Sequence, residues 1–303
     1  MYPKELFLGI KPYGLLIAVG LLGCFAVLFT YNKKKPVDKA FTDEVFYIGV
    51  AAIFLGFLSA TLFQSVYNYI ANPEEGFHFG GMTFIGGLIG GVASFLIIYF
   101  IFRKRLHGRL LDIISMVPCC ITIAHAFGRL GCLMAGCCHG AYLGDEPVVG
   151  GLLMEGTIQT SSGVWVSHTG YFVPTQLYEA VFLFILFGLF SFLWLKFSFK
   201  HNMSLYLVLY GIFRFIIEFF RYDDRGQFLG TSISPSQFWS ILMVVLGIAL
   251  FFLFNYFWKK EKKAKENEKV YTYTKPFYNF FQNRAIHFRR WLRYDFRFRT
   301  RVR

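Results

Sequence analysis

Seven apolar stretches, each uncharged or nearly so and most of them about 20 residues long, dominate this sequence. An α-helix rises ~1.5 Å per residue, so about 20 apolar residues cross a hydrocarbon core about 30 Å thick. Only 16% of the residues are charged and the mean hydropathy is +0.48, which excludes a soluble globular enzyme, a disordered chain and a collagen-like chain. The sequence therefore predicts an all-α integral membrane protein with seven transmembrane helices, at residues 12–32, 45–72, 80–102, 113–128, 176–195, 202–220 and 233–258.

Lysine and arginine residues gather in alternate connections, namely those after the first, third, fifth and seventh stretches. Connections rich in these residues are retained on the cytoplasmic side of a membrane. The connection at 72–79 holds Glu74 and Glu75 but no Lys or Arg, and the segment after residue 128 holds one Arg before the fifth stretch. We therefore expect the N-terminus outside and the C-terminus in the cytoplasm, which requires an odd number of spans.

Two regions depart from the pattern of apolar spans. Residues 141–175 are rich in Gly, Ser and Thr, and the alternation from Thr157 to Val166 predicts a short hairpin, so we expect a small external cap on a membrane domain of residues 1–258. Residues 259–303 hold 15 Lys and Arg and 4 acidic residues, almost the whole net charge of +13. This tail either contacts anionic lipids of the cytoplasmic leaflet or is a disordered basic tail that enforces topology, while nucleic-acid binding is a distant third reading.

Ionisable residues inside a membrane cost about 2.5 to 3.5 kcal/mol on insertion scales, so each one is a candidate for function. The stretch 202–220 and its end carry four polar residues that fall on one helical stripe: Tyr210, Arg214, Glu218 and Arg221. Two readings are open for this stripe. It lines a ligand site, or Arg214 and Glu218 form a structural ion pair that holds neighbouring helices in place.

A second polar feature is the glycine-rich sequence around Arg129, with glycines at 128, 131, 136 and 140. We expect the chain to leave its helix at Gly128, because glycine permits turns that other residues resist. A guanidinium in such a turn suits phosphate, since its planar fork matches two phosphate oxygens. Arg129 and Arg214 are thus expected in the outer half of the bundle, where a lipid phosphate is the available anion. The glycines at 80–91, taken alone, indicate a helix-packing seam.

These pieces, in this order, resemble the prolipoprotein diacylglyceryl transferases, the seven-helix enzymes of bacterial lipoprotein maturation. The resemblance covers nearly all of residues 10–258. It rests on Tyr-Gly-Leu at 13–15, the glycines at 80–91, Gly-Arg-Leu-Gly at 128–131, Gly140, Pro-Thr-Gln-Leu-Tyr-Glu at 174–179, Arg-Phe-Ile-Ile-Glu-Phe-Phe-Arg at 214–221 and Ser-Gln at 236–237.

The resemblance implies a transferase of the bacterial cytoplasmic (inner) membrane that moves diacylglyceryl from phosphatidylglycerol to the lipobox cysteine of prolipoproteins, which it recognises with their signal peptides. It implies no cofactor, no metal and no nucleotide. Arg129 and Arg214 match the family's two essential arginines and would hold the phosphate. The other implied residues are Tyr210, Glu218 and His139 as catalytic candidates and Tyr13, Gly86, Gly87, Gly140 and Cys137 as substrate-binding candidates.

The chain departs from the family pattern at three positions. Ile85 stands where the family usually has a histidine before the glycine run, and Cys132 and Cys137 stand where it has an asparagine and an acid. His139 and His125 are the imidazoles that could take the place of the missing histidine.

The cysteines leave alternative functions open. A divergent paralogue could use Cys137 or Cys138 as a nucleophile with His139 as its base. A metal- or redox-sensing membrane protein could use Cys132, Cys137, Cys138 and His139, with Cys119 and Cys120 on the preceding helix. Buried cysteines can also act as small apolar residues, which is the expectation for Cys24, Cys119 and Cys120. A transporter is the last alternative, although the sequence shows no inverted repeat.

Overall fold

The computed structural model describes residues 11–34, 37–159, 165–221 and 233–260, together with residues 262, 263 and 266. In chain order the elements are α1 (Pro12–Lys34), α2 (Lys39–Ala71), η1 (Pro73–Glu75), α3 (Phe84–Phe102), α4 (Leu110–Ile113), α5 (Val117–Ala135), β1 (Tyr142–Gly144), β2 (Leu152–Gln159), β3 (Trp165–Phe172), α6 (Thr175–Phe197), α7 (Asn202–Ile217) and η2 (Glu218–Phe220). A further helix covers Pro235–Lys260. Each predicted apolar stretch overlaps one of the longer helices, although the stretch 113–128 begins at the last residue of α4 and stops short of the end of α5.

Within the described residues, six helices are long and apolar enough to cross a membrane: α1, α2, α5, α6, α7 and Pro235–Lys260. The apolar part of α3, Gly86–Phe102, is shorter than the others. The chain is therefore a mostly helical, multi-pass membrane protein. Apolar side chains such as Leu22, Phe54 and Ile185 are exposed on its helices, as expected where lipid replaces water as the solvent.

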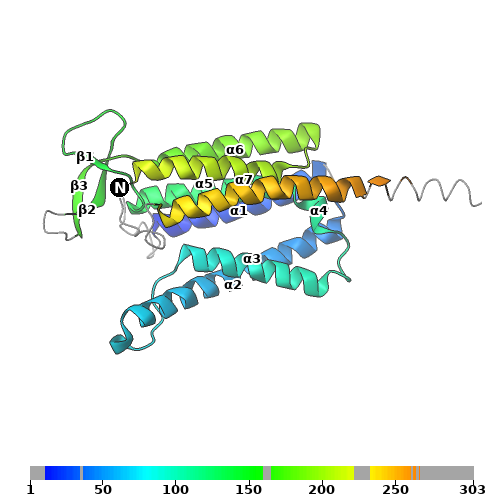
Figure 1. Cartoon of the computed structure of the whole chain (residues 1–303), viewed down its shortest axis with the longest axis horizontal. Helices are drawn as coiled ribbons and strands as arrows, with labels where there is room; N and C mark the ends of the chain where they lie inside the picture. Colours follow the sequence, from blue (N-terminus) through cyan, green and yellow to red (C-terminus); the bar gives the residue numbers. More distant parts are fainter. Residues whose placement is uncertain are drawn as a thin grey trace, which may run out of the picture. The chain divides into compact units, whose positions relative to one another are not determined.

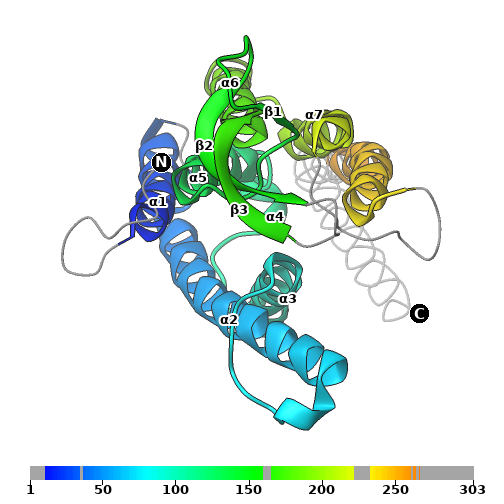
Figure 2. The same cartoon turned by 90° about the vertical axis from the view of Figure 1, so that its left-hand side faces the viewer.

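Helices α1, α5, α6 and α7 run side by side, as Figures 1 and 2 show from two directions, and α5 packs extensively against both α1 and α6. Helices α2 and α3 pack mainly on each other. Small residues allow the close approaches. Gly20 of α1, for example, lies so near Ala124 of α5 that an added β-carbon would be 2.8 Å from the Ala124 carbonyl oxygen.

The expected break at Gly128 is wrong. Helix α5 continues through Arg129 and Gly131 to Ala135, and it ends at Gly136, which has φ +70° and donates its N–H to the carbonyls of Cys132 and Leu133. Within a membrane the hydrogen bonds of a continuous helix satisfy the backbone groups, so a glycine alone does not end the helix. At Gly128 an added β-carbon would meet no atom within 4 Å, so no close contact requires a turn there. Gly136 does end it, because a positive φ favours glycine and because the Glu155 carbonyl lies 2.7 Å from where a β-carbon would be.

The expected cap contains a three-stranded antiparallel sheet in the order β1-β3-β2. Strands β2 and β3 pair from Leu152 with Phe172 to Gln159 with Trp165, so the predicted hairpin is confirmed and is longer than the 157–166 stretch suggests. Met154 and Phe172 are buried against Leu133, which joins the sheet to the end of α5. Helix α6 begins three residues after β3, so the sheet positions the start of α6 as well.

The predicted stripe on 202–220 is also corrected at its end. Tyr210 and Arg214 lie on α7, but Glu218 begins the 3-10 turn η2 and Arg221 is extended and forms an isolated β-bridge with Gly140. Arg221 therefore joins the loop after α5. Of the tail 259–303, almost all lies outside the described residues, and the prediction for it has no structural counterpart here.

Candidate active site

Glu179 is the electrostatic centre of the helix bundle. It lies one turn into α6, is 1% exposed, and accepts a hydrogen bond from the Tyr210 hydroxyl at 2.7 Å. Its Oε1 atom also lies 3.0 Å from Nε of Arg129 and 3.7 Å from Nε2 of His125. A buried carboxylate is expensive unless cations and donors compensate it, and here α5 and α7 supply both.

Arg214 forms a second buried pair, with Nη2 2.7 Å from Oε2 of Glu218 and 3.1 Å from the Ser236 hydroxyl, to which it donates. Ser234 donates to the other carboxylate oxygen of Glu218 at 3.1 Å. The ion pair considered from the sequence is therefore present. Arg214 also interacts electrostatically with Glu179, and its buried Nη1 atom has no hydrogen-bond partner among the described residues.

The two arginines thus come from separate helices and both act on one carboxylate. Arg129 on α5 and Arg214 on α7 each keep a carboxylate partner, and both lie in the field of Glu179 on α6. Such a pair of guanidinium groups can bind an oxyanion with several charge-assisted hydrogen bonds.

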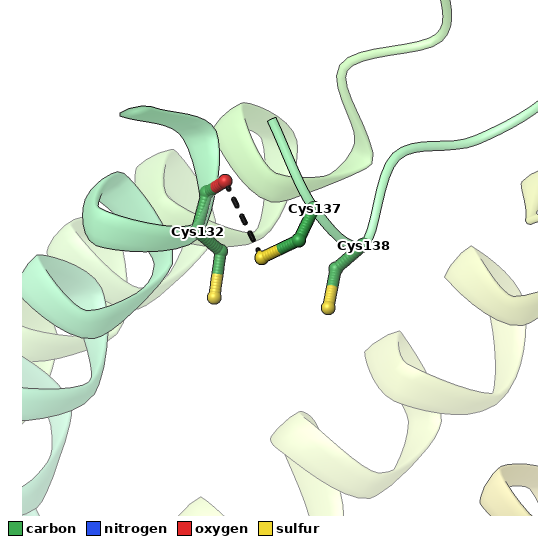
Figure 3. Close-up of side chains that lie close together, drawn as sticks. All are labelled: Cys132, Cys137 and Cys138. Carbon is green, nitrogen blue, oxygen red and sulfur yellow. Dashed lines mark hydrogen bonds between the residues drawn. The ribbon is translucent and has the colours of Figure 1, made fainter. Parts of the chain in front are cut away.

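Beyond Arg129, the last turn of α5 and the following loop bring together Cys132, Cys137 and Cys138, whose sulfur atoms lie within 4.8 Å of one another (Figure 3). Tyr13 at the start of α1 lies beside them, against Gly131, and interacts electrostatically with all three thiols and with Arg129. Hydrogen bonds with Cys132 and Cys137, reinforced by the charge of Arg221, hold the pKa of the Cys138 thiol below its ordinary value.

His139 follows this cluster and is buried against the cap. The Thr157 N–H donates to its Nε2 at 3.0 Å, and its Nδ1 lies 3.0 Å from the Gly140 carbonyl oxygen. Both ring nitrogens are therefore occupied by backbone groups. Gly140 itself is enclosed by backbone, since it donates to the Val173 carbonyl at 2.8 Å and an added β-carbon would collide with the Phe220 carbonyl.

Gly86 and Gly87 lie on α3, where they pack against α2 and not against the residues described above. Their missing side chains make room for Phe63 and Ala60 of α2, and the Ser59 hydroxyl donates to the Gly86 carbonyl at 2.9 Å. The side chain of Ile85 lies outside the described part of the structure. The glycine run thus forms the seam between α2 and α3.

A sequence model of one family, described as prolipoprotein diacylglyceryl transferase, matches residues 4–253. The chain belongs to this family. A phosphatidylglycerol–prolipoprotein diacylglyceryl transferase of Clostridium tetani is 32% identical over 255 residues, covering 82% of this chain and 94% of that protein.

Other diacylglyceryl transferases show the same extent of similarity. One from Clostridium perfringens, named phosphatidylglycerol–prolipoprotein diacylglyceryl transferase 2, is 30% identical over 82% of this chain and 92% of its own length. One from Coxiella burnetii is 31% identical over 78% of this chain and 87% of its own. The resemblance found from the motifs is therefore confirmed at the level of the family.

In this diacylglyceryl transferase, the structure shows further residues in contact with the candidate site residues. Glu179 was part of a matching motif but not a site candidate, and Ser234 and Ser236 complete the environment of Glu218 and Arg214. A signal for Glu179 is present in the sequence, because it is the one carboxylate in the apolar stretch 176–195. Ser236 belongs to the matching Ser-Gln motif at 236–237, whereas no sequence signal marks Ser234, and the partners of both serines are seen only in the tertiary structure.

Proposed function

We propose that this chain is a phosphatidylglycerol–prolipoprotein diacylglyceryl transferase. Relatives at about 30% identity over most of the chain carry that name. The observation that carries the proposal is the convergence of Arg129 and Arg214, from two helices, on the field of the buried carboxylate Glu179. In a lipid environment this is a site for an anionic headgroup phosphate.

In the proposed reaction the thiolate sulfur of the lipobox cysteine attacks the glyceryl carbon that carries the phosphate. A carbon–sulfur bond forms, the carbon–oxygen bond breaks, and glycerol phosphate leaves with the bonding electrons. Charge grows on the phosphate in the transition state, so Arg129 and Arg214 stabilise that state more than the bound lipid. The open Nη1 donor of Arg214 is available for this charge.

The remaining residues support the arginines. Glu179 and Glu218 hold the two guanidinium groups in place, and the Tyr210 hydroxyl fixes Glu179. Tyr13 lies where it can contact a substrate bound beside Arg129. These contacts favour a positioning role for Glu218 and Tyr210.

Four further candidates receive different roles in the proposal. His139 and Gly140 shape the loop after α5 through their backbone contacts, and Cys137, which is exposed, contacts the substrate. Gly86 and Gly87 let α3 approach α2 closely. Their effect on the substrate site is therefore indirect, through the packing of these two helices.

For the topology, we propose seven spans with α3 as the third. Its 19 residues extend ~28 Å at ~1.5 Å per residue, close to the thickness of a hydrocarbon core. Alternating positive connections then put the N-terminus and the cap outside and the C-terminus in the cytoplasm of a bacterium, with the protein in its cytoplasmic (inner) membrane. The prolipoprotein signal peptide meets the site within this membrane, and the basic tail contacts anionic lipids of the cytoplasmic leaflet.

The test is lipid transfer by the purified protein in nanodiscs that contain phosphatidylglycerol, with a lipobox peptide as acceptor and mass spectrometry as readout. The wild type is expected to add diacylglyceryl to the peptide cysteine. Arg129→Ala and Arg214→Ala are each expected to lose more than about 100-fold in rate. Arg103→Ala, which removes an exposed arginine at the end of α3, is the matched control and keeps its activity. Transfer that persists in Arg129→Ala, or no transfer by the folded wild type, would refute the proposal.

A further inference from the structure

The sulfur atoms of Cys132, Cys137 and Cys138 lie close together beside Arg129. Neither the ion pairs nor the proposed phosphate site requires this close spacing. Cys132 belongs to the last turn of α5, and Cys137 and Cys138 follow the glycine that ends it. The side chains of Cys132 and Cys138 extend in the same direction, and the Cys137 sulfur points toward Cys132, whose carbonyl it approaches at 3.7 Å (Figure 3). Three sulfur atoms within 4.8 Å of one another form a ready set of soft ligands.

The spacing of the sulfur atoms is close to that of a metal site. Zinc binds thiolate sulfur at about 2.3 Å, so sulfurs that share one ion lie about 4 Å apart. The present separations reach this value with small side-chain rotations, because the limit on all of them is 4.8 Å. No change in the course of the backbone is needed.

The loop that carries two of the thiols is held in place from α6. The Gln176 side chain donates to the Cys137 carbonyl at 2.6 Å, and the Thr175 hydroxyl donates to the Cys138 carbonyl at 2.9 Å. Cys138 has φ +64°, a left-handed conformation that is strained for a residue with a β-carbon. These bonds hold a strained backbone in the conformation that keeps both sulfurs within 4.8 Å of the Cys132 sulfur.

Nearby cations balance the negative charge of such a site. Arg221 hydrogen-bonds to the Cys138 thiol, and Arg129 interacts electrostatically with Cys132 and Cys138. Three thiolates around a divalent ion carry one net negative charge, which these guanidinium groups compensate. His139 is not a fourth ligand, because its two nitrogens already contact backbone groups.

We propose that Cys132, Cys137 and Cys138 form a three-thiolate site for one soft d¹⁰ metal ion, zinc or copper(I). Three protein ligands leave the fourth tetrahedral position of zinc open, as in catalytic rather than structural zinc sites. Resting on the proposed function, we assign this position to the acceptor cysteine of the prolipoprotein. When this cysteine binds, its S–H bond breaks, a metal–sulfur bond forms and the proton goes to water. The acceptor is then held as a thiolate beside Arg129.

The first experiment measures the metal itself. The full-length protein is purified anaerobically, dialysed against zinc or, separately, copper(I), and its metal content is measured by mass spectrometry. One ion per chain is expected with at least one of the two metals. Cys132→Ser, Cys137→Ser and Cys138→Ser are each expected to bind at least about tenfold more weakly. Cys24→Ser, a partly buried cysteine of α1 outside the cluster, is the matched control and binds like the wild type.

Melting temperatures show that each variant is folded, so a loss of metal reports on the ligands. Wild-type protein that binds no more metal than the triple serine variant would overturn the site. A disulfide between any two of the three cysteines in protein isolated without oxidant would also overturn it, because oxidised sulfurs cannot ligate.

The second experiment tests the acceptor role with the cobalt(II) form of the protein. A lipobox peptide is expected to change the cobalt–thiolate absorption, whereas the same peptide with serine in place of cysteine leaves it unchanged. Equal spectra with both peptides would overturn the acceptor role. Because neither readout requires lipid transfer, failure of the proposed function appears separately, as bound metal and a bound peptide thiol without product.

Discussion

At the scale of single residues, Glu179 determines the charge balance of the candidate active site. Its carboxylate is nearly inaccessible to solvent and contacts Arg129, Tyr210 and His125. Removing one partner of a buried ion pair leaves an uncompensated charge and costs about 3–5 kcal/mol, whereas losing one hydrogen bond to a charged group costs about 1.5–3 kcal/mol. The partners of Glu179 can therefore be separated by their effect on stability.

We expect Glu179→Gln to lower the free energy of unfolding by about 3 kcal/mol, because the Arg129 guanidinium loses its counter-charge at constant side-chain volume. Lipid transfer falls with it, since Arg129 is no longer held. Tyr210→Phe removes only the hydrogen bond to this carboxylate and is expected to lose about 1.5 kcal/mol. Thermal unfolding in detergent compares the two variants, and equal melting temperatures would contradict this account.

A second prediction at this scale concerns Asp145 in the cap. Hydrogen bonds from Tyr142 and His168, both at 2.7 Å to the same oxygen, hold the pKa of the Asp145 carboxyl below its ordinary value. A carboxyl whose pKa is lowered by folding stabilises the fold above its unfolded pKa, and this contribution is lost as the pH falls through the folded pKa.

The amides of β1 and β3 are therefore expected to be less protected from exchange in acid. Hydrogen-exchange mass spectrometry between pH 3 and pH 7 measures this as a lower protection factor, the intrinsic exchange rate at each pH divided by the observed rate. In Asp145→Asn this part of the pH dependence disappears. An unchanged pH profile in that variant would show that Asp145 does not couple β1 to β3.

At the scale of elements, α5 links the parts of the site. It packs against α1 and α6, carries Arg129 on the face toward Glu179, and ends in the loop of Cys137 and Cys138. Its contact with α1 depends on a close approach at Gly20, where an added β-carbon would meet backbone atoms of Ala124. Backbone cannot move aside as a flexible side chain can.

We expect Gly20→Ala to destabilise the protein by about 1–3 kcal/mol, because it forces α1 and α5 apart. The same substitution at Gly14, on the same helix, meets no atom within 4 Å and is expected to be neutral or slightly stabilising, since alanine favours a helix. Melting temperatures of the two single variants provide the comparison. Equal destabilisation at both positions would place the effect in α1 itself and not in its contact with α5.

At the scale of the whole molecule, the charged connections are expected to set the orientation in the membrane. The cap contains Val149, which is fully exposed, and α1 ends at the exposed Lys34. The proposed topology places these two residues on opposite sides of the membrane.

In a Cys137→Ser background, we expect Val149→Cys to react with a membrane-impermeant maleimide in intact bacteria. Lys34→Cys is expected to react only after the cells are permeabilised. The reverse pattern would invert the proposed topology, and labelling of both residues in intact cells would refute the odd number of spans that the topology places between them.

The amino-acid sequence by itself was sufficient for the membrane class, the positions of the apolar helices, the cap hairpin and the family. The first three properties follow from local composition and periodicity, which need no knowledge of neighbours in space, and the family follows from the resemblance of the motifs to those of known transferases. Only the tertiary structure decided that α5 runs through Gly128, that Glu179 joins Arg129 to Tyr210, and that three cysteines converge. Each depends on which helices pack together, and pairing between segments far apart in one chain is not encoded in the spacing within any one of them.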